Sequence, residues 1–361
     1  MFHSRQYLGT VGQVNSDWLS YNHYQGWLCN TRCQAMTPST LVSFSTLAAT
    51  ASDLAFSGAV VVPNGKIICI PYDHTKIGIF DPSTGTYTDG PTAGSGASKF
   101  SGAVMHTNGK VYLVPHDYTN VGEYDPDANT YADKVYAGAS GVKFSGGHLM
   151  PDGKIWFMPD TTRAAAIYDP VADTITAGPN TNMNVVGCMT TFERFVMRGS
   201  GSLFVYNILT STMATTSGLT SGEFGAAILA PNGKVVFVPK GRTNIEVYDT
   251  LHNRLTAGPA VPSSATYRGA CLTADGRVAM FPLASADTRI LLFDAKSLTY
   301  EYGPTTGTGA GGAAMFWGAI LAPNGKIYPI PYRFGNFSEF DLLHGTVGTS
   351  NCMHPTVNRG F

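Results

Sequence analysis

Residues 56–71 read FSGAVVVPNGKIICIP, residues 100–115 read FSGAVMHTNGKVYLVP, and residues 144–159 read FSGGHLMPDGKIWFMP. Each stretch holds two short apolar runs separated by an Asn-Gly or Asp-Gly pair. Because both residues of such a pair tolerate positive φ, the pair favours a tight hairpin, and we expect a type I′ turn. The second run ends in proline, which has no N–H for a strand ladder and therefore belongs at a strand end. We expect each stretch to form a β-hairpin.

The hairpin pattern recurs along most of the chain. Its anchoring glycine is found seven times, with spacings of 44, 44, 41, 38, 44 and 49 residues, at Gly58, Gly102, Gly146, Gly187, Gly225, Gly269 and Gly318. Six copies carry the Asn-Gly or Asp-Gly pair, whereas Glu193 and Arg194 occupy its place in the fourth copy. We therefore expect the fourth copy to be degenerate and to use a different turn.

Two further runs complete most copies. The third run ends in an acidic residue in six copies, at Asp81, Asp125, Asp169, Asp249, Asp294 and Asp341. Aspartate is a natural start for a turn, because its carboxylate accepts backbone N–H groups two residues further on. A short fourth run follows, such as TYTDGP at residues 86–91. The pattern thus predicts four strands in each copy.

Four-stranded units of this length are typical of the blades of a β-propeller. Each unit is apolar on both faces and must stack on its neighbours, and a ring of seven leaves no open end. The predicted fold class is all-β, a seven-bladed β-propeller of four-stranded blades with a non-repeat N-terminal segment. The Gly-Ala pairs in the first runs favour close approach of the innermost strands around the axis.

The ends of the chain need a separate account. We expect residues 1–39 to form an N-terminal extension that docks or packs, residues 40–345 to form the propeller, and residues 346–361 to form a tail. Thr40 to Leu47 reads like a spare fourth strand, and we predict that it completes the seventh blade; the tail at 345–351 is the alternative donor. The aromatic residues of the extension could lie across the propeller or dock on a neighbouring subunit, which would give a homo-oligomer.

Composition excludes several classes of partner. Of the 361 residues only 13% are charged, the 23 basic and 24 acidic residues are scattered, and the net charge is −1. Nucleic acids and anionic membranes require clustered Lys and Arg, so we expect neither as a partner. No apolar run approaches the length of a membrane-spanning helix, which argues against membrane insertion. The first residues lack the basic and then apolar pattern of a signal peptide.

The cysteines are interpreted by their surroundings. Cys69 lies inside an apolar strand-like run, where we expect a reduced thiol in the core. Cys29 and Cys33 are four residues apart, but no second pair follows, as a zinc knuckle would require. A disulfide and a zinc site remain alternatives for these two, and the redox state of Cys352 is open. We expect no cofactor.

The motifs F-[SW]-G-A, P-[ND]-G-K and [FY]-D-P, spread over residues 40–345, resemble those of kelch-like propellers, including the seven-bladed ring of the galactose-oxidase type. The P-N-G-K form is similar to divergent repeats in phage, large-virus and bacterial proteins. The chain departs from kelch proper, which carries a Gly-Gly pair and spaced Tyr and Trp in each blade. The resemblance implies the fold but not the activity, since propellers serve many functions. The copper ligands of the oxidases and the Asp boxes of sialidases have no counterpart here.

The loops between the second and third strands of the blades are the most informative part of the repeat. They place aromatic rings beside Asp, His and Arg, a mixture that suits a sugar or a protein partner. The alternative is that the tyrosines simply pack over the strand ends. The candidate ligand-binding residues are Tyr72, Asp73, His74, His116, Asp117, Tyr118, Arg163, Arg242, Tyr332 and Arg333.

Two histidine positions invite a sharper hypothesis. His74 and His116 occupy similar places in neighbouring copies, and a metal site would require them to converge with Asp73 or Asp117. His148 lies in an innermost run, where we expect a hydrogen-bonded core or axial histidine rather than a general base.

No catalytic motif was found: the sequence has no G-x-S-x-G, no H-E-x-x-H, no phosphate loop and no nucleotide fingerprint. The innermost runs are apolar and small, which argues against a charged catalytic axis. We therefore predict a non-enzymatic virion protein, at a phage tail or another exposed position, that attaches to a host-surface glycan or protein or to other virion proteins. The alternatives are a carbohydrate-active lyase or hydrolase and an intracellular kelch-like interaction scaffold.

Overall fold

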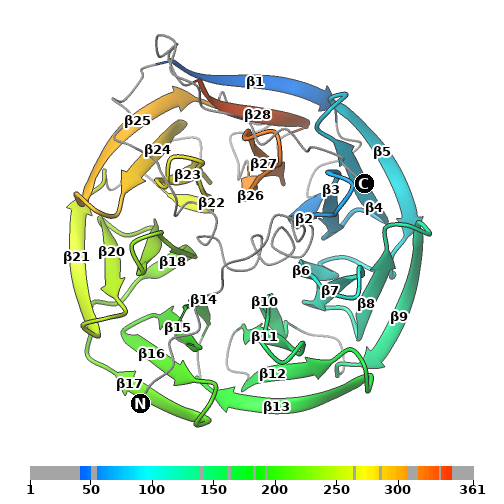
Figure 1. Ribbon diagram of the computed structural model, residues 1–361, viewed down its shortest axis with the longest axis horizontal. Helices are drawn as coiled ribbons and strands as arrows, with labels where there is room; N and C mark the ends of the chain where they lie inside the picture. Colours follow the sequence, from blue (N-terminus) through cyan, green and yellow to red (C-terminus); the bar gives the residue numbers. More distant parts are fainter. Residues whose placement is uncertain are drawn as a thin grey trace, which may run out of the picture.

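The computed structural model describes residues 41–49, 55–138, 142–160, 164–181, 184–191, 193–262, 266–283, 287–306, 316–332 and 335–343. In these ranges the regular structure is entirely β. The strands form seven antiparallel sheets of four strands each, set around a central axis (Figure 1). This confirms the predicted seven-bladed propeller.

The first three blades are regular. Blade 1 consists of β2 (Phe56–Val61), β3 (Ile67–Pro71), β4 (Lys76–Asp81) and β5 (Thr86–Thr92). Blade 2 consists of β6 (Phe100–Met105), β7 (Val111–Pro115), β8 (Asn120–Asp125) and β9 (Thr130–Tyr136). Blade 3 consists of β10 (Phe144–Leu149), β11 (Ile155–Pro159), β12 (Ala164–Asp169) and β13 (Thr174–Asn180). In each blade the first strand lies nearest the axis and the last lies at the rim (Figure 1).

Blades 4 to 6 repeat the same order. Blade 4 consists of β14 (Val185–Met189), β15 (Arg194–Gly199), β16 (Ser202–Asn207) and β17 (Thr212–Thr216). Blade 5 consists of β18 (Glu223–Leu229), β19 (Lys234–Lys240), β20 (Asn244–Asp249) and β21 (Arg254–Ala260). Blade 6 consists of β22 (Tyr267–Leu272), β23 (Val278–Pro282), β24 (Arg289–Asp294) and β25 (Thr299–Thr305).

Blade 7 is built from both ends of the described chain. It takes β26 (Phe316–Leu321), β27 (Ile327–Pro331) and β28 (Asn336–Leu343), and β1 (Leu41–Ala49) supplies the outermost strand. The blue β1 lies along the red β28 in Figure 1, and their antiparallel register runs from Leu41 opposite Leu343 to Ala49 opposite Asn336. The predicted clasp is confirmed. Residues 345–351 lie outside the described residues, and β1 fills the place proposed for them.

The hairpin turn was predicted with the wrong type. The glycine, at Gly65 for example, has φ of 84°, but the preceding Asn64 is not among the described residues with positive φ. The amide of Gly65 donates to the carbonyl of Val62 at 2.8 Å, which closes a type I turn followed by a left-handed glycine. The copy with Thr107 in place of proline forms the same turn, with Gly109 at φ of 86° and its amide donating to the carbonyl of His106 at 3.0 Å. The difference therefore comes from the register of the loop: Asn and Gly occupy the third and fourth positions of the turn, not its two central positions.

The fourth copy departs from the others where the sequence indicated. Its strand β14 has five residues. Its turn lacks glycine, and Glu193 itself adopts φ of 54°. That conformation costs a non-glycine residue free energy, so this turn is the most strained form of the repeat.

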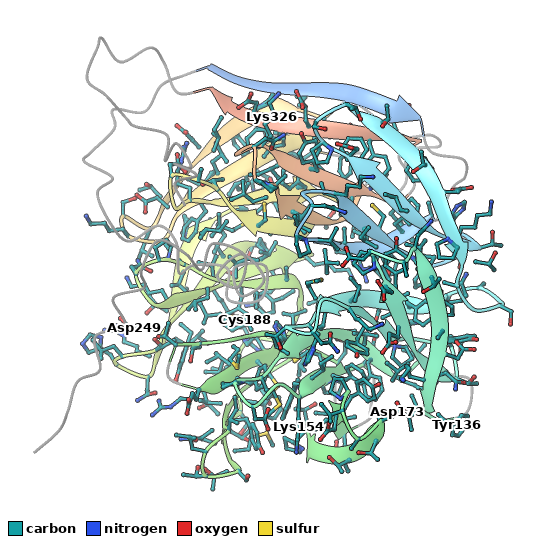
Figure 2. The ribbon with its side chains drawn as sticks, turned by 45° about the vertical axis from the view of Figure 1, so that its right-hand side comes forward. Tyr136, Lys154, Asp173, Cys188, Asp249 and Lys326 are labelled. Carbon is teal, nitrogen blue, oxygen red and sulfur yellow. The ribbon has the colours of Figure 1, made fainter. Side chains whose placement is uncertain are left out.

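The aspartates that end the third strands act as predicted. The Asp125 carboxylate accepts the amides of Asp127 and Ala128, each at 3.0 Å. Asp249 accepts the amides of Leu251 and His252 at the same distance. Figure 2 shows Asp249 at the periphery of the molecule, on one of these turns. Such carboxylates satisfy backbone donors that the tight turn leaves without partners.

The cores lie between neighbouring blades. Phe56, Ile67 and Phe80 of blade 1 pack with Tyr328 and Phe337 of blade 7 in one buried cluster. Equivalent clusters join the other neighbouring pairs. Because full burial of a phenylalanine contributes roughly 2–3 kcal/mol, these seams supply most of the favourable free energy of the ring.

Glycine at the start of the inner strands permits close approach around the axis, as predicted. A Cβ on Gly58 would lie 3.2 Å from the Cα of Gly102 in the next blade. A Cβ on Gly269 would lie 2.6 Å from the carbonyl oxygen of Gly318, which no real side chain tolerates. The backbones of neighbouring inner strands therefore touch directly.

Cys69, Cys188 and Cys271 are buried and free, which confirms the expectation for Cys69. Burial raises the pKa of the Cys188 thiol to about 12, and Figure 2 shows this residue in the middle of the molecule. The N-terminal extension at 1–39, the tail at 346–361 and Cys29, Cys33 and Cys352 lie outside the described residues. In the described part of the chain no helix is long and apolar enough to span a membrane.

Candidate functional site

The antiparallel order gives the ring two different faces. One face carries the hairpin turns with glycine and the aspartate turns. The other, which we call the loop face, carries the loops between the second and third strands of each blade and the links to the next blade. We call the loops between the second and third strands the b–c loops, and the connections to the next blade the links.

The loop face is held together by hydrogen bonds between blades. The amide of Lys99, in a link, donates to the carbonyl of Tyr72 at 2.9 Å, and the amide of His116 donates to the carbonyl of Lys99 at 2.8 Å. The Nζ of Lys99 is turned inward and donates to the carbonyl of His74 at 2.8 Å. Lys143 repeats this in the next blade, with its Nζ donating to the carbonyl of Tyr118 at 3.0 Å. These b–c loops are therefore fixed in place.

A group of polar and aromatic side chains surrounds the axis on the loop face. We call it the axial cluster, and it draws on all seven blades: Tyr72, His116, Asp160, Asn184, Glu223, Lys240, Arg268, Trp317 and Tyr332. Tyr72 is central to its aromatic part. The Tyr72 ring centroid lies 4.8 Å from that of Trp317, 5.9 Å from that of Tyr332 and 5.5 Å from that of His116.

Arg268 and Trp317 form the next part of the cluster. The guanidinium carbon of Arg268 lies 3.4 Å from the centre of the Trp317 ring, so the cation is stacked on an aromatic face. Burial lowers the pKa of Arg268 to about 10, and the nearby Tyr332, Tyr72, Asp160 and Glu223 oppose that shift. The Trp317 ring also packs against Tyr332, with centroids 4.4 Å apart and planes at 80°.

A histidine and a carboxylate continue the cluster into blade 3. The Nε2 of His116 lies 3.8 Å from the Asp160 carboxylate, and its Nδ1 lies 3.2 Å from the carbonyl of Ser98. Asn184 donates to Asp160 at 2.7 Å. Burial lowers the pKa of His116, with Asp160 opposing, so the ring is neutral at pH 7. The carbonyl of Ser98 then places the proton on Nδ1 and leaves Nε2 unprotonated.

Blade 5 contributes an ion pair at the edge of the cluster. Lys240 donates to Glu223 at 2.7 Å, and this bond lowers the pKa of Glu223. The side chain of Glu223 is 69% exposed, so the pair contributes little to stability.

Members of the cluster act on one another electrostatically from separate blades. Arg268 in blade 6 helps to lower the pKa of His116 in blade 2, and Asp160 in blade 3 acts on Arg268. Neighbouring members touch from blade 6 through blades 7, 1, 2 and 3 to blade 4. The arrangement can therefore surround a ligand centred on the axis, with aromatic rings on one side and hydrogen-bonding groups on the other.

The predicted site residues separate into three groups. Tyr72, His116 and Tyr332 belong to the axial cluster. The side chains of Asp73, His74 and Tyr118 instead bind within or between blades 1 and 2. Asp73 accepts the amide of Ser98 at 2.6 Å, the Nε2 of His74 lies 3.1 Å from Asp89, and Tyr118 donates to Asp133 at 2.8 Å.

Asp117 is a further predicted site residue, and its backbone is hydrogen-bonded. The amide of Asp117 donates to the carbonyl of Ser98 at 3.0 Å, and its carbonyl lies 3.4 Å from the Nζ of Lys143. Its backbone thus takes part in the bonding of the links. Arg163 and Arg333 lie outside the described residues.

Arg242 has a structural place between blades 4 and 5. It is buried, donates to Glu246 at 2.7 Å and to the carbonyl of Thr220 at 2.8 Å, and lies over the Phe224 ring. Arg198 binds the same carboxylate at 2.9 Å. Since the terminal nitrogens of Arg242 already have these partners, its side chain holds the link from blade 4 against blade 5.

The histidines do not converge on a metal. His74 faces Asp89 and His116 faces Asp160, which are different carboxylates. Within the ranges described above, no three His, Cys, Asp or Glu side chains gather as a metal site requires. His148 accordingly has another partner: its Nε2 lies 3.2 Å from the carbonyl of Gly187, and burial lowers its pKa to about 4. It is a hydrogen-bonded histidine between blades, as expected.

Sequence reasoning missed the polar side of the axial cluster. The inner strands were expected to be uncharged around the axis, yet Arg268 and Glu223 lie near their starts. The residue before the anchoring glycine could have indicated this polar side. Ser57 and Ser101 precede the anchoring glycine and donate to carbonyls of the next blade, whereas Arg268 and Trp317 occupy that position in blades 6 and 7.

Comparison with known proteins gives the fold alone. No family model matches the sequence, and no curated protein matches it. A catalytically inactive virginiamycin B lyase from Staphylococcus aureus with Quinupristin aligns with a TM-score of 0.70 and 12% identity, covering 83% of this chain and 99% of that one. A fungal alcohol oxidase of the AA5 family in complex with copper aligns with a TM-score of 0.62 and 13% identity, covering 82% and 75%.

A third similar structure is the extracellular domain of the protein BT4673 from B. thetaiotaomicron, with a TM-score of 0.63, 11% identity, and coverage of 82% of this chain and 40% of that one. At such identities the same propeller serves different chemistries, so the activity must be argued from the side chains. The resemblance to kelch-like and P-N-G-K repeats stays a prediction.

Proposed function

We propose that the protein is a non-enzymatic binding module that captures its ligand at the axial cluster on the loop face. The observation that carries this proposal is the convergence of Tyr72, His116, Trp317 and Tyr332, from three blades, around one point of the axis. Aromatic faces stack on the C–H faces of sugar rings, and neighbouring polar groups fix orientation. A host-surface glycan is therefore the ligand class that we expect first.

A glycan array followed by titration of the ligand that binds tests the proposal. Trp317→Ala and Tyr72→Ala should each weaken binding at least tenfold. Tyr136→Ala is the matched control, because Tyr136 is 60% exposed and lies at the outer edge of blade 2 (Figure 2). Full binding by Trp317→Ala would refute the axial cluster as the site.

The setting that we propose is the surface of a virion, as a tail or other exposed component. The low charge, the abundance of glycine and the style of the repeat support this choice. The test is sedimentation of native material with mass spectrometry of the fractions. Recovery of the chain with large particles agrees with a virion component, and recovery only as a free protein contradicts it.

A second candidate function is catalysis by the same cluster. It is favoured by a neutral His116 whose Nε2 faces Asp160, since such a nitrogen can accept a proton. A virginiamycin B lyase is also similar in fold. A screen of polysaccharide substrates tests it: product that disappears with His116→Ala supports a lyase or hydrolase, and product that persists with that variant excludes this site.

A further inference from the structure

Arg268 differs from the other half-buried or buried arginines that the structure describes. Arg198 and Arg242 bind Glu246, Arg277 binds Asp275, Arg289 binds Asp287, and Arg194 donates to the Asn253 side chain. No hydrogen bond or ion pair engages the Arg268 guanidinium within the described ranges, although it is only half-exposed. A desolvated cation without an anion is costly, so this position calls for a partner from outside the described chain.

The stacked geometry shows which part of Arg268 a partner would meet. One face of the guanidinium is covered by the Trp317 ring at 3.4 Å. The N–H groups of a guanidinium point outward in its plane, and stacking leaves that edge available. Two parallel N–H donors match the two oxygens of a carboxylate, which is the arrangement that arginine forms most favourably.

The neighbouring charges limit the charge of the ligand. Glu223 and Asp160 act electrostatically on Arg268 but form no ion pair with it. Glu223 is paired with Lys240, and Asp160 accepts from Asn184. A ligand with one negative charge would be balanced by Arg268, whereas a phosphate dianion would be repelled by the two carboxylates.

From these observations we infer that the ligand of the axial cluster carries a single carboxylate next to a ring with an apolar face. Arg268 binds the carboxylate, and Tyr72 and Tyr332 contact the ring. The inference rests on the proposed binding function and narrows its ligand class. An acidic sugar and an aromatic acid share this chemistry, and the experiment separates them.

Calorimetric titration with matched probes tests the inference. The first arm uses oligosaccharides ending in uronic or sialic acid, each with its carboxyl-reduced counterpart. The second arm uses benzoate with benzyl alcohol. In the arm that holds the true ligand class, the acid should bind at least tenfold more tightly than its reduced counterpart.

Variants assign the preference to Arg268. Arg268→Gln should bring the affinity for the acid down to that of the reduced probe. Arg268→Lys should keep only part of the preference, because a lysine lacks the planar fork. Arg254→Gln is the control, since Arg254 is exposed on the rim strand β21. Thermal unfolding of each variant checks that the fold is retained.

The possible failures are distinguishable. Equal binding of acids and reduced probes by the wild-type protein overturns the carboxylate inference and leaves the binding function intact. A preference that survives Arg268→Gln also overturns it. If no acid or reduced probe binds and the glycan array is blank, both the inference and the proposed function fail.

Discussion

Phe80 of blade 1 and Phe337 of blade 7 stack with ring centroids 4.6 Å apart and planes at 12°. Both side chains are fully buried. The pair spans the seam where the beginning and the end of the ring meet, so residues separated by most of the chain are held together by one aromatic contact. Ring closure therefore depends on packing at this seam as well as on the pairing of β1 with β28.

Replacement of Phe337 by alanine should weaken this seam strongly. The cavity and the lost burial should lower the free energy of unfolding by about 3–5 kcal/mol. Denaturant unfolding measures the change, with Tyr136→Ala as an exposed aromatic control. A loss below about 1 kcal/mol would mean that the seam does not support the ring.

Removal of β1 should open the ring. Two truncations isolate its effect: one begins at residue 41 and keeps the strand, and the other begins at residue 50 and removes it. The second should unfold at a clearly lower temperature than the first, because β28 loses its antiparallel partner and blade 7 its outer strand. Equal unfolding temperatures of the two truncations would contradict the clasp.

The stability of the protein should fall as the pH drops from about 6.5 to about 4. The pKa of His148 is about 4 in the folded state against 6.5 as its ordinary value, so the unfolded state binds its proton first. The stabilising effect is present above pH 6.5 and is lost through this window, with a full size of about 3 kcal/mol. Unfolding measured across pH should be flatter for His148→Gln. Val171→Ala, at an exposed apolar residue, is the control and should leave the slope unchanged.

The two linking lysines should fix the b–c loops for binding. Lys99→Met would remove the Nζ donor of the His74 carbonyl, while the carbonyl of Tyr72 keeps the backbone amide of residue 99, and the loss should cost about 1–3 kcal/mol of stability. Because the bond to His74 holds the b–c loop that carries Tyr72, affinity at the axial cluster should fall as well. Calorimetry and thermal unfolding measure both effects, and Lys296→Met on an exposed turn is the control. Unchanged affinity would show that the bonds made by Lys99 do not position the axial cluster for binding.

The sequence was sufficient to predict the fold because the same pattern of short strands and turns recurs seven times. Gly58 and its equivalents mark inner strands, and Asp81 and its equivalents end third strands. The turn type was mistaken because the Asn-Gly pair was assigned to the two central positions of the turn, whereas it occupies the third and fourth positions. A dipeptide alone therefore does not determine the register of a turn.

The axial cluster was only partly predictable for a different reason. Tyr72, His116 and Tyr332 stand in loops that attract attention, whereas Arg268 and Trp317 lie in strands whose repeat suggests small residues. Their meeting depends on the closure of the ring, which brings seven separate positions to one axis. The sequence does show that Arg268 and Trp317 replace the serine found at the position of Ser57. Only the closed ring shows that these two replacements stack on each other.

These replacements lead to a last prediction. The double change Arg268→Ser and Trp317→Ser would give blades 6 and 7 the residue that blades 1 and 2 carry before the anchoring glycine. In blade 1 the Ser57 hydroxyl donates to the carbonyl of Phe100 at 2.6 Å, and the new serines can form the same bond to the next inner strand. Stability should therefore fall by no more than about 2 kcal/mol, because Trp317 is only half-buried.

Ligand binding by the same double variant should disappear, since both the stacking ring and the guanidinium are gone. Unfolding in denaturant and titration with the wild-type ligand measure the two effects on one protein. A variant that folds normally and does not bind identifies the two residues as functional departures from the repeat. A variant that fails to fold would instead show that Arg268 and Trp317 hold blades 6 and 7 together. Ser57→Ala in blade 1 would then measure how much one hydrogen bond between neighbouring inner strands contributes to stability.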